Sequence, residues 1–351
     1  MVHILSEQPG DAAIQNNLAG EVARLSAQGL FSGLVVVARG CDEMANVSGG
    51  YADRSSQLPI TRRTRFTLGS VGKLFTATAI GQLIDAGKIS FEDTVGKFIA
   101  HYPNETVRNR ATIGMLLSHT SGLADFLSKR TPRMLEQGVL QASEFIPLYQ
   151  NDKPRFEPGT GWAYSNAGFA LAGAILEQVS GETYPDYLRK RVFGPTGMTD
   201  SDPNNIPRRT DRLAIPYTRE TPHGQTLEWH EARIDVGSPA GGAISSAADL
   251  VRFADALRNG GLISRTLFEE MTRTQARSPK RGARYGYGFV IEDIHGHTVI
   301  GHKGTFTGIS TQLCIFLNAP YTVVALCNRD SPAAERATAH AVSLVVAELS
   351  K

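Results

Sequence analysis

The chain has 351 residues, a length that suits one large domain or two closely joined ones. Apolar residues make up 41% and charged residues 20%, so the composition is that of an ordinary folded protein and argues against disorder. Lysine and arginine total 36 against 34 aspartates and glutamates, and the net charge of +2 gives no electrostatic reason to expect nucleic acid or an anionic membrane as a partner.

The first residues, MVHILSE, do not have a basic segment followed by an apolar one, and no stretch elsewhere is long enough to span a bilayer. We therefore expect a cytoplasmic protein. The three cysteines, Cys41, Cys314 and Cys327, lie far apart and mostly in apolar surroundings. This spacing favours buried free thiols over disulfides or metal ligands.

The N-terminal part predicts a helix followed by two strands. Apolar residues at helical spacing predict an amphipathic helix over residues 11–28. The β-branched run at 34–38 predicts a strand, and a second strand is expected around 45–51, with a turn at 40–42 between them.

The middle of the chain is dominated by helical patterns. Residues 70–86 are so apolar that the helix they predict should be buried. Short helices are expected further on, at 113–118, 142–151, 168–179 and 184–192. No alternating strand pattern stands out between about 95 and 240, so this region is expected to be rich in helices.

The C-terminal part changes period after a helix expected at 247–258. The strands predicted there form an antiparallel meander at 287–292, 298–302, 310–316 and 322–328, before a last helix at 333–349. A two-stranded N-terminal hairpin is not stable alone, so both ends of the chain should complete one sheet. We expect an α+β fold, with an antiparallel sheet and flanking helices from 1–68 and 265–351, a helix-rich domain from 69–264, and the active site between them.

A serine and a lysine stand three residues apart where the buried helix begins. On a helix Ser70 and Lys73 share a face, which brings the amine close enough to take the hydroxyl proton. Burial disfavours the ammonium form of lysine and can make it a base. The helix N-terminus adds backbone N–H groups that stabilise developing negative charge.

The S-x-x-K pattern alone is not specific, because roughly one instance is expected by chance in a chain of this size. A serine helix cap followed by a surface lysine is the alternative. Two other motifs do not match: a nucleotide-binding P-loop needs glycine at Thr67 and Ser or Thr at Leu74, and a nucleophile elbow needs glycine at Leu68.

The second motif is Tyr164-Ser165-Asn166, which follows a Pro-Gly turn and precedes a predicted helix. A side chain on such a rigid bend can project into a cleft. A tyrosine beside a cationic lysine can ionise more readily and pass a proton to a leaving group. Asn166 offers an amide that can hold a substrate.

The third motif is GHKGT at 301–305, on a strand that we expect against the helix bearing Ser70. An edge strand there offers backbone N–H and C=O groups that can position an acyl substrate. Gly304 would allow a substrate to approach closely. His302 and Thr305 complete the candidate substrate-binding residues.

In the order of these motifs the sequence resembles the serine β-lactamase/DD-peptidase superfamily, in particular the class C β-lactamase-like branch that includes D-stereospecific peptidases and esterases. Longer stretches are also similar to it, namely LLSHTSGL (116–123), the segment from PG to YSNAG (158–168), PTGM (195–198) and PAGG (239–242). The resemblance implies a covalent acyl-enzyme on Ser70, activation by Lys73 and Tyr164, and an oxyanion held by the N–H groups of Ser70 and Thr305. It implies no metal or organic cofactor.

One departure concerns the substrate. Where β-lactamases carry Lys-Thr-Gly, this chain has His302-Lys303-Gly304, a triplet more similar to the peptidase and esterase members. Without the first lysine a substrate carboxylate lacks its usual cation. Lys303 should not replace it, because neighbouring side chains on a strand point to opposite faces.

The sequence therefore predicts a serine hydrolase for a small-molecule ester, amide or peptide, most readily a carboxylic ester or a small amide. D-aminopeptidase, DD-carboxypeptidase or weak β-lactamase activity is the alternative within this class, and a non-catalytic binding protein with the same fold is the alternative outside it. His295 and His297 lack the companions that a zinc site needs, so a metal site is not predicted. Segments 125–150 and 205–240 are expected to wall the substrate pocket.

Overall fold

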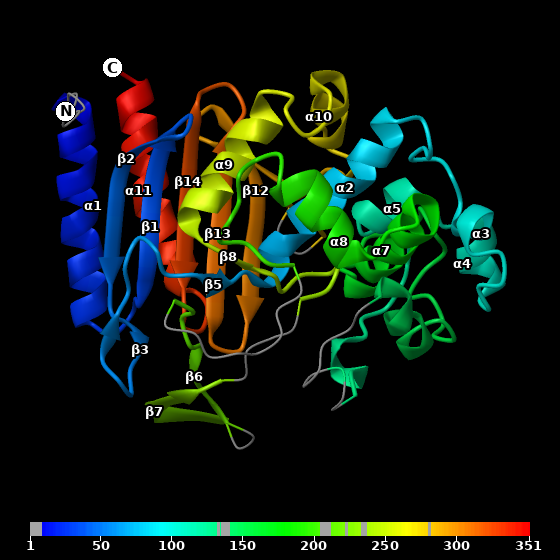
Figure 1. The fold of residues 1–351 in the computed structure, drawn as a ribbon, viewed down its shortest axis with the longest axis horizontal. Helices are drawn as coiled ribbons and strands as arrows, with labels where there is room; N and C mark the ends of the chain where they lie inside the picture. The colour runs from blue at the N-terminus through cyan, green and yellow to red at the C-terminus, as the bar shows by residue number, and fades with distance from the viewer. Residues whose placement is uncertain are drawn as a thin grey trace.

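The computed structural model describes residues 9–131, 134, 141–203, 212–221, 224–232, 237–279 and 282–351. An eight-stranded antiparallel sheet has the order β2-β1-β14-β13-β12-β11-β10-β9. Its strands are β1 (Gly33–Arg39), β2 (Asp42–Gly49), β9 (Ala276–Arg277), β10 (Arg284–Tyr285), β11 (Val290–Ile294), β12 (His297–Phe306), β13 (Ile309–Phe316) and β14 (Tyr321–Cys327). The predicted α+β fold, with helices around this sheet, is confirmed (Figure 1).

The two ends of the chain build one sheet, as the unstable N-terminal hairpin predicted. β1 pairs with β2 on one side and with β14 on the other, where Leu34 lies opposite Leu326. The strands β12, β13 and β14 follow as the expected meander. The sheet extends further than predicted, through β10 and β9, which are too short to show a periodic pattern.

Side chains alternate between two cores across this sheet. Val35 and Val37 face the core shared with α1 (Pro9–Ala27) and α11 (Ala333–Leu349), which lie side by side on one face (Figure 1). Leu34 and Val36 face the other core, which the sheet shares with α2 (Lys73–Asp85) and α9 (Ala247–Arg258). All four of these side chains are fully buried. The alternation fixes the strand register, because a shift by one residue would exchange the two faces.

The remaining helices gather beside the second face of the sheet (Figure 1). They are α3 (Val95–Phe98), α4 (Glu105–Arg110), α5 (Ile113–Leu117), η2 (Leu127–Lys129), η3 (Ala142–Leu148), α7 (Asn166–Ser180), α8 (Tyr184–Leu188), η4 (Arg189–Phe193) and α10 (Arg265–Met271). Several begin at a serine or threonine whose side chain accepts a backbone N–H, as Thr112, Ser165 and Thr183 do. The expected helices are thus present. The domain boundaries at 68 and 264 stay a prediction, and α9 of the middle part packs on β1 and β14.

The expectation of no strand between about 95 and 240 is wrong. β6 (Tyr217–Thr221) and β7 (Gly224–Glu231) form an antiparallel hairpin. The sequence did not predict this hairpin because most of its residues are polar, and no regular alternation of apolar and polar residues marks the two strands. The hairpin contacts another segment, since the Arg329 guanidinium lies over the Trp229 ring, 4.5 Å from its centroid, and Arg219 of β6 lies over the same ring at 4.6 Å.

Two further pairs of short strands are β3 (Tyr51–Asp53) with β4 (Leu58–Pro59), and β5 (Phe66–Thr67) with β8 (Ile244–Ser245).

All three cysteines are free, as expected, but only Cys314 and Cys327 are buried. Cys41 is exposed because it lies in the turn between β1 and β2.

None of the helices in the described part of the chain combines the length and apolar character that a membrane span requires. The opening segment MVHILSE lies outside the described residues.

Candidate active site

Ser70 lies on the turn that leads into α2. A 3₁₀ turn, η1 (Gly69–Gly72), precedes the helix. Ser70 lies on this turn, and Lys73 is the first residue of α2. Gly72 packs against backbone, because a Cβ placed there would lie 3.2 Å from the Cα of Gly241. The expected helix over 70–86 is therefore present with a tighter first turn. This turn leaves Ser70 partly accessible while the helix behind it is buried.

Lys73 is fully buried, which excludes the alternative of a surface lysine. Its Nζ lies 3.2 Å from Ser70 Oγ and donates to Asn166 Oδ1 at 2.7 Å. It also donates to the carbonyl oxygen of Ala240. The amine also lies over the rings of Tyr164 and Phe169, 4.8 and 5.4 Å from their centroids.

Tyr164 approaches the same hydroxyl from a separate segment, just before α7. Its O–H donates to Ser70 Oγ at 2.8 Å, so Oγ is contacted by both Tyr164 and Lys73. Asn166 follows as the first residue of α7 and is buried. The structure thus brings together Ser70, Lys73, Tyr164 and Asn166, which the sequence predicted to act together.

The expectation that Tyr164 ionises readily is wrong for this site. Burial raises the pKa of Tyr164 well above its usual value, and the hydrogen bond with Ser70 offsets this only in part, while the charge of Asp125 raises it further. Burial could not be inferred from the sequence around Tyr164. The phenol is therefore a protonated donor.

His119 supports the Tyr164 ring and has no role in the sequence-based prediction. Its ring centroid lies 4.3 Å from that of Tyr164 and 4.6 Å from that of Tyr285. The backbone N–H of Ser165 donates to its Nδ1 at 3.2 Å, which leaves the proton on Nε2. Burial, and then the charge of Lys73, keep its pKa well below the usual value. The only signal in the sequence was its place in the LLSHTSGL stretch.

The GHKGT motif lies on β12, beside η1 as expected. β12 is not an edge strand along its whole length, since β11 pairs with it from His297 to Gly301. Beyond Gly301, in the described residues, β12 pairs with β13 alone. The half of the strand that contains Gly304 and Thr305 thus has one edge without a partner strand.

His302 is buried and bonded at both ring nitrogens. Its Nδ1 lies 2.6 Å from the Lys303 carbonyl, which can only accept, so Nδ1 carries the proton and Nε2 accepts from the Tyr285 hydroxyl at 2.9 Å. Burial, followed by the charge of Lys73, lowers the pKa of His302 to about 3. The imidazole is neutral at physiological pH and supplies no cation for a substrate carboxylate.

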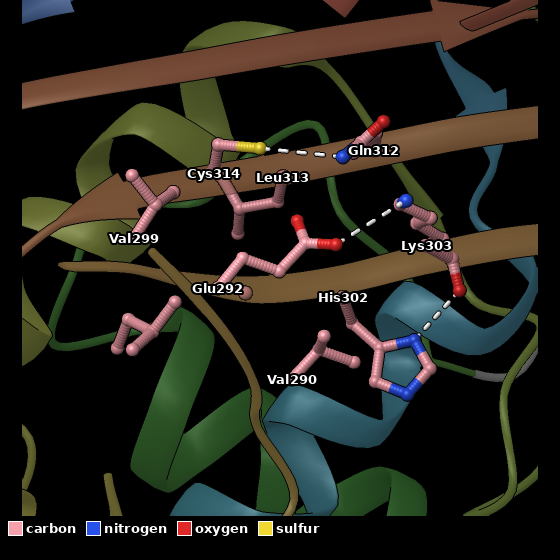
Figure 2. A pocket seen from close by; sticks show the side chains of 10 residues that line it. Val290, Glu292, Val299, His302, Lys303, Gln312, Leu313 and Cys314 are labelled. Carbon is pink, nitrogen blue, oxygen red and sulfur yellow. Dashed lines mark hydrogen bonds and ion pairs between the residues drawn. The ribbon is translucent and has the colours of Figure 1, made fainter. Parts of the chain in front are cut away.

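Lys303 lies on the opposite side of the strand, as alternation along β12 predicted. Figure 2 shows it beside Glu292, with its amine 3.6 Å from the carboxylate, while the His302 ring points to the other side of the strand. The pocket drawn there also includes Gln312 and Cys314 of β13. Lys303 therefore does not supply the missing positive charge next to Ser70.

Gly304 allows a close approach within the protein itself. A Cβ at this position would lie 2.0 Å from the Leu68 carbonyl oxygen and 2.3 Å from Thr311 Oγ1. The Thr311 hydroxyl donates to the same carbonyl at 2.6 Å. Gly304 thus lets β12 pack directly on the segment that leads into Ser70.

We expect Gly304→Ala to lower the free energy of unfolding by about 1–3 kcal/mol, because the added methyl group meets backbone that cannot move aside. Gly20→Ala is the matched control. Gly20 lies within α1 with no atom near the added methyl, so this change should raise the free energy of unfolding by about 0.5–1 kcal/mol. Urea unfolding measures both. An unchanged midpoint for Gly304→Ala would contradict the close approach.

A small pocket adjoins Ser70. It is lined by Gly69, Ser70, Leu127, Asn166, Ser238, Ala240, Gly241, Gly242, Thr305 and Phe306. Its volume of about 30 Å³ suffices for one or two water molecules. Leu127, Ser238 and Ala240 belong to the segments expected as walls. Residues 132–133, 135–140, 205–211, 222–223 and 233–236 of those segments lie outside the described part of the chain.

The buried His302 predicts a pH dependence of stability. Its pKa is lower in the folded protein, about 3, than the ordinary value of 6.5. The unfolded chain therefore binds the proton first as pH falls, and His302 reduces stability between about pH 6.5 and 3. We expect the melting temperature of His302→Gln to fall less steeply than that of the wild type from pH 7 to pH 5. Parallel curves would contradict the neutral assignment.

The chain is similar to known proteins in both sequence and structure. A sequence model of the family described as Beta-lactamase matches residues 14–348. Penicillin-binding protein 4* of Bacillus subtilis is 29% identical over 86% of this chain and 68% of its own length. Esterase EstB of Burkholderia gladioli is 28% identical over 79% of each chain. The solved structure of a D-stereospecific amidohydrolase from Streptomyces sp. superposes with a TM-score of 0.77 at 25% identity, covering 95% of this chain and 98% of that one.

Proposed function

The chain belongs to the beta-lactamase family and is a serine hydrolase for esters or amides, and from this premise we propose that Ser70 is its nucleophile, with Lys73 and Tyr164 moving the protons. One observation supports this assignment above the others. Ser70 Oγ lies 3.2 Å from a buried amine and 2.8 Å from a protonated phenol, and the two come from different elements. A nucleophile with a base and an acid within hydrogen-bond reach is the arrangement that acyl transfer needs.

The proposed acylation begins with Lys73 in its neutral form. Nζ takes the proton from Ser70 as Oγ attacks the substrate carbonyl carbon, and the carbonyl oxygen becomes an oxyanion. The backbone N–H groups of Ser70 and Thr305 are proposed to hold that oxyanion. Tyr164 donates its proton to the leaving group as the bond to the carbonyl carbon breaks, and the proton gained by Lys73 returns to the phenolate.

Deacylation reverses these roles with water as the nucleophile. The water gives a proton to Lys73 as its oxygen bonds to the acyl carbon, and Ser70 Oγ leaves with a proton supplied through Tyr164. The products are the carboxylic acid and the free enzyme. Side chains, backbone N–H groups and the attacking water supply every group that these steps use.

We propose that the preferred substrates are neutral carboxylic esters or small neutral amides. His302 is uncharged and bonded to Tyr285, and Lys303 lies on the other side of β12. A substrate carboxylate, which β-lactams and D-Ala-D-Ala peptides both carry, would find no cation from these two residues. A D-amino acid amide is the second candidate, because one relative is a D-stereospecific amidohydrolase.

A substrate panel tests this proposal. We expect hydrolysis of p-nitrophenyl acetate and butyrate by the wild type, and rates lower by about two orders of magnitude or more with the β-lactam nitrocefin, because a charged hydrogen-bond partner is absent. D-alanine amide and D-Ala-D-Ala are compared at the same enzyme concentration through the release of D-alanine, with Ser70→Ala as the background. A preference for either D-substrate over the esters would reverse our ranking.

A further inference from the structure

Asp125 lies behind the three reacting side chains and contacts none of them in the described structure. Its carboxylate accepts from Asn166 Nδ2 at 3.2 Å through Oδ1 and at 3.1 Å through Oδ2. The other end of the same amide, Oδ1, accepts from Lys73. Asn166 therefore connects a carboxylate to the proposed base.

We propose that Asp125 is a positioning residue, which orients the Asn166 amide so that its oxygen faces Lys73 and thereby directs the Lys73 amine toward Ser70. This inference rests on the proposed roles of Ser70 and Lys73. An amide has a donor end and an acceptor end, and a carboxylate can only accept. With Asp125 beside it, the nitrogen of Asn166 must face the carboxylate and the oxygen must face Lys73.

The orientation of Asn166 determines where the lone pair of Lys73 points. A neutral amine has two N–H bonds and one lone pair. The oxygen of Asn166 and the carbonyl of Ala240 can only accept, so they take the two N–H bonds. The remaining direction faces Ser70 Oγ, where the lone pair can receive the serine proton. A flipped Asn166 would present its NH₂ group and compete with Ser70 for that lone pair.

Asp125 is held firmly enough to impose this orientation. Its Oδ1 also accepts the backbone N–H groups of Phe126 and Leu127, at 2.7 and 3.2 Å. The adjacent Ala124 carbonyl accepts from the hydroxyl of Ser165, the residue that caps α7. The carboxylate therefore lies next to the first residue of that helix, where a negative charge is favoured.

The charge of Asp125 also reaches the proton-handling groups. It raises the pKa of the Tyr164 phenol, in addition to the larger effect of burial. The same negative charge favours the ammonium form of Lys73, which is one contact beyond Asn166. Loss of the charge should therefore change the pH at which Lys73 becomes a base, whereas loss of packing alone should not.

Asp125→Asn removes the charge of the carboxylate and keeps the shape of the side chain. It therefore distinguishes a loss of charge from a loss of packing. Its oxygen can still accept from Phe126 and Leu127, which turns its new NH₂ group toward Asn166. Two amide nitrogens would then face each other at about the 3.1 Å now separating Asn166 Nδ2 from Asp125 Oδ2, and a flip of Asn166 relieves this clash. Asp125→Glu retains the charge, and Asp186→Asn, at a half-exposed residue of α8 paired with Arg189, is the matched control.

The experiment measures acylation by p-nitrophenyl butyrate, a neutral ester, across pH. We expect Asp125→Asn to lower the plateau of kcat/KM by about 10- to 100-fold, mainly through kcat, and to move its rising limb to lower pH. Asp125→Glu should keep the limb at the wild-type pH, and Asp186→Asn should match the wild type. Asp125→Ser, which also removes the charge, replaces Asp125→Asn if that variant does not fold.

Three results would overturn the inference. One is a wild-type plateau and limb in Asp125→Asn, and another is a lowered plateau with an unmoved limb, which would make the role merely structural. The third is a loss confined to KM with kcat unchanged, which would mean that Asp125 contributes to substrate binding and not to the orientation of the base. Ser70→Ala is measured in parallel, because wild-type rates in that variant would instead refute the proposed function.

Discussion

Ser70→Ala is expected to abolish acyl-enzyme formation and to lower ester hydrolysis by about four orders of magnitude or more, as loss of a nucleophile does in other serine hydrolases. In the structure this hydroxyl contacts both Lys73 and Tyr164. Without it, the two proton handlers have no oxygen to activate. Intact-mass spectrometry after treatment with a fluorophosphonate should show one adduct on the wild type and none on Ser70→Ala.

Ser264→Ala is the matched control for this change. Ser264 caps α10 and bonds with Asp85, away from the pocket next to Ser70. Its loss should lower the free energy of unfolding by about 1 kcal/mol and leave the rate of ester hydrolysis unchanged. A full adduct on Ser70→Ala would show that another residue is the nucleophile, and a rate loss in Ser264→Ala would show that the assay reports stability instead.

The second large effect concerns the proton handlers. Lys73→Ala and Tyr164→Phe are each expected to lower acylation by about two orders of magnitude or more, since each removes a proton transfer. Tyr164→Phe keeps the ring against His119 and removes only the hydroxyl. Its effect should be largest with an alkyl ester or an amide, whose leaving group needs a proton, and smaller with p-nitrophenyl butyrate. Stopped-flow acylation rates measure both variants.

Lys303→Ala tests whether the position of the amine matters. Lys303 belongs to the same motif as His302 but pairs with Glu292 on the other side of β12, so its loss should leave acylation within about twofold of the wild type. Wild-type acylation in Lys73→Ala would assign the base to another residue. An equal effect of Tyr164→Phe on good and poor leaving groups would contradict its role as the proton donor.

Sequence patterns predicted the elements that have a local apolar pattern. In β1, β13 and β14 this pattern is a continuous apolar run buried on both faces of the sheet, and in α1, α9 and α11 it is a set of apolar residues at helical spacing. The β6–β7 hairpin was missed because it depends on contacts with distant residues, such as that of the Trp229 ring with the Arg329 guanidinium. A periodic pattern within one segment of the sequence cannot predict a contact with a residue far away in the chain.

The candidate site divides in the same way. Motif order and a helical spacing of three residues predicted Ser70, Lys73 and Tyr164 as the catalytic residues, because both features can be read from the sequence alone. His119 and Asp125 were missed, since their importance depends on a ring and an amide brought to them from the segment 164–166. The raised pKa of Tyr164 was missed for a related reason, because it depends on how completely the fold covers the phenol.

The pairing of β1 with β14 has a consequence for how the protein is made. β1 is synthesised before all the helices of the second core, whereas β14, the strand it needs as a neighbour, is synthesised after them. Until then its second edge is open in the nascent chain, and such edges promote aggregation. Contacts between residues so far apart in sequence also slow folding. Completion of the sheet, and with it the packing of β12 against the Ser70 turn, must therefore wait until β14 has been synthesised.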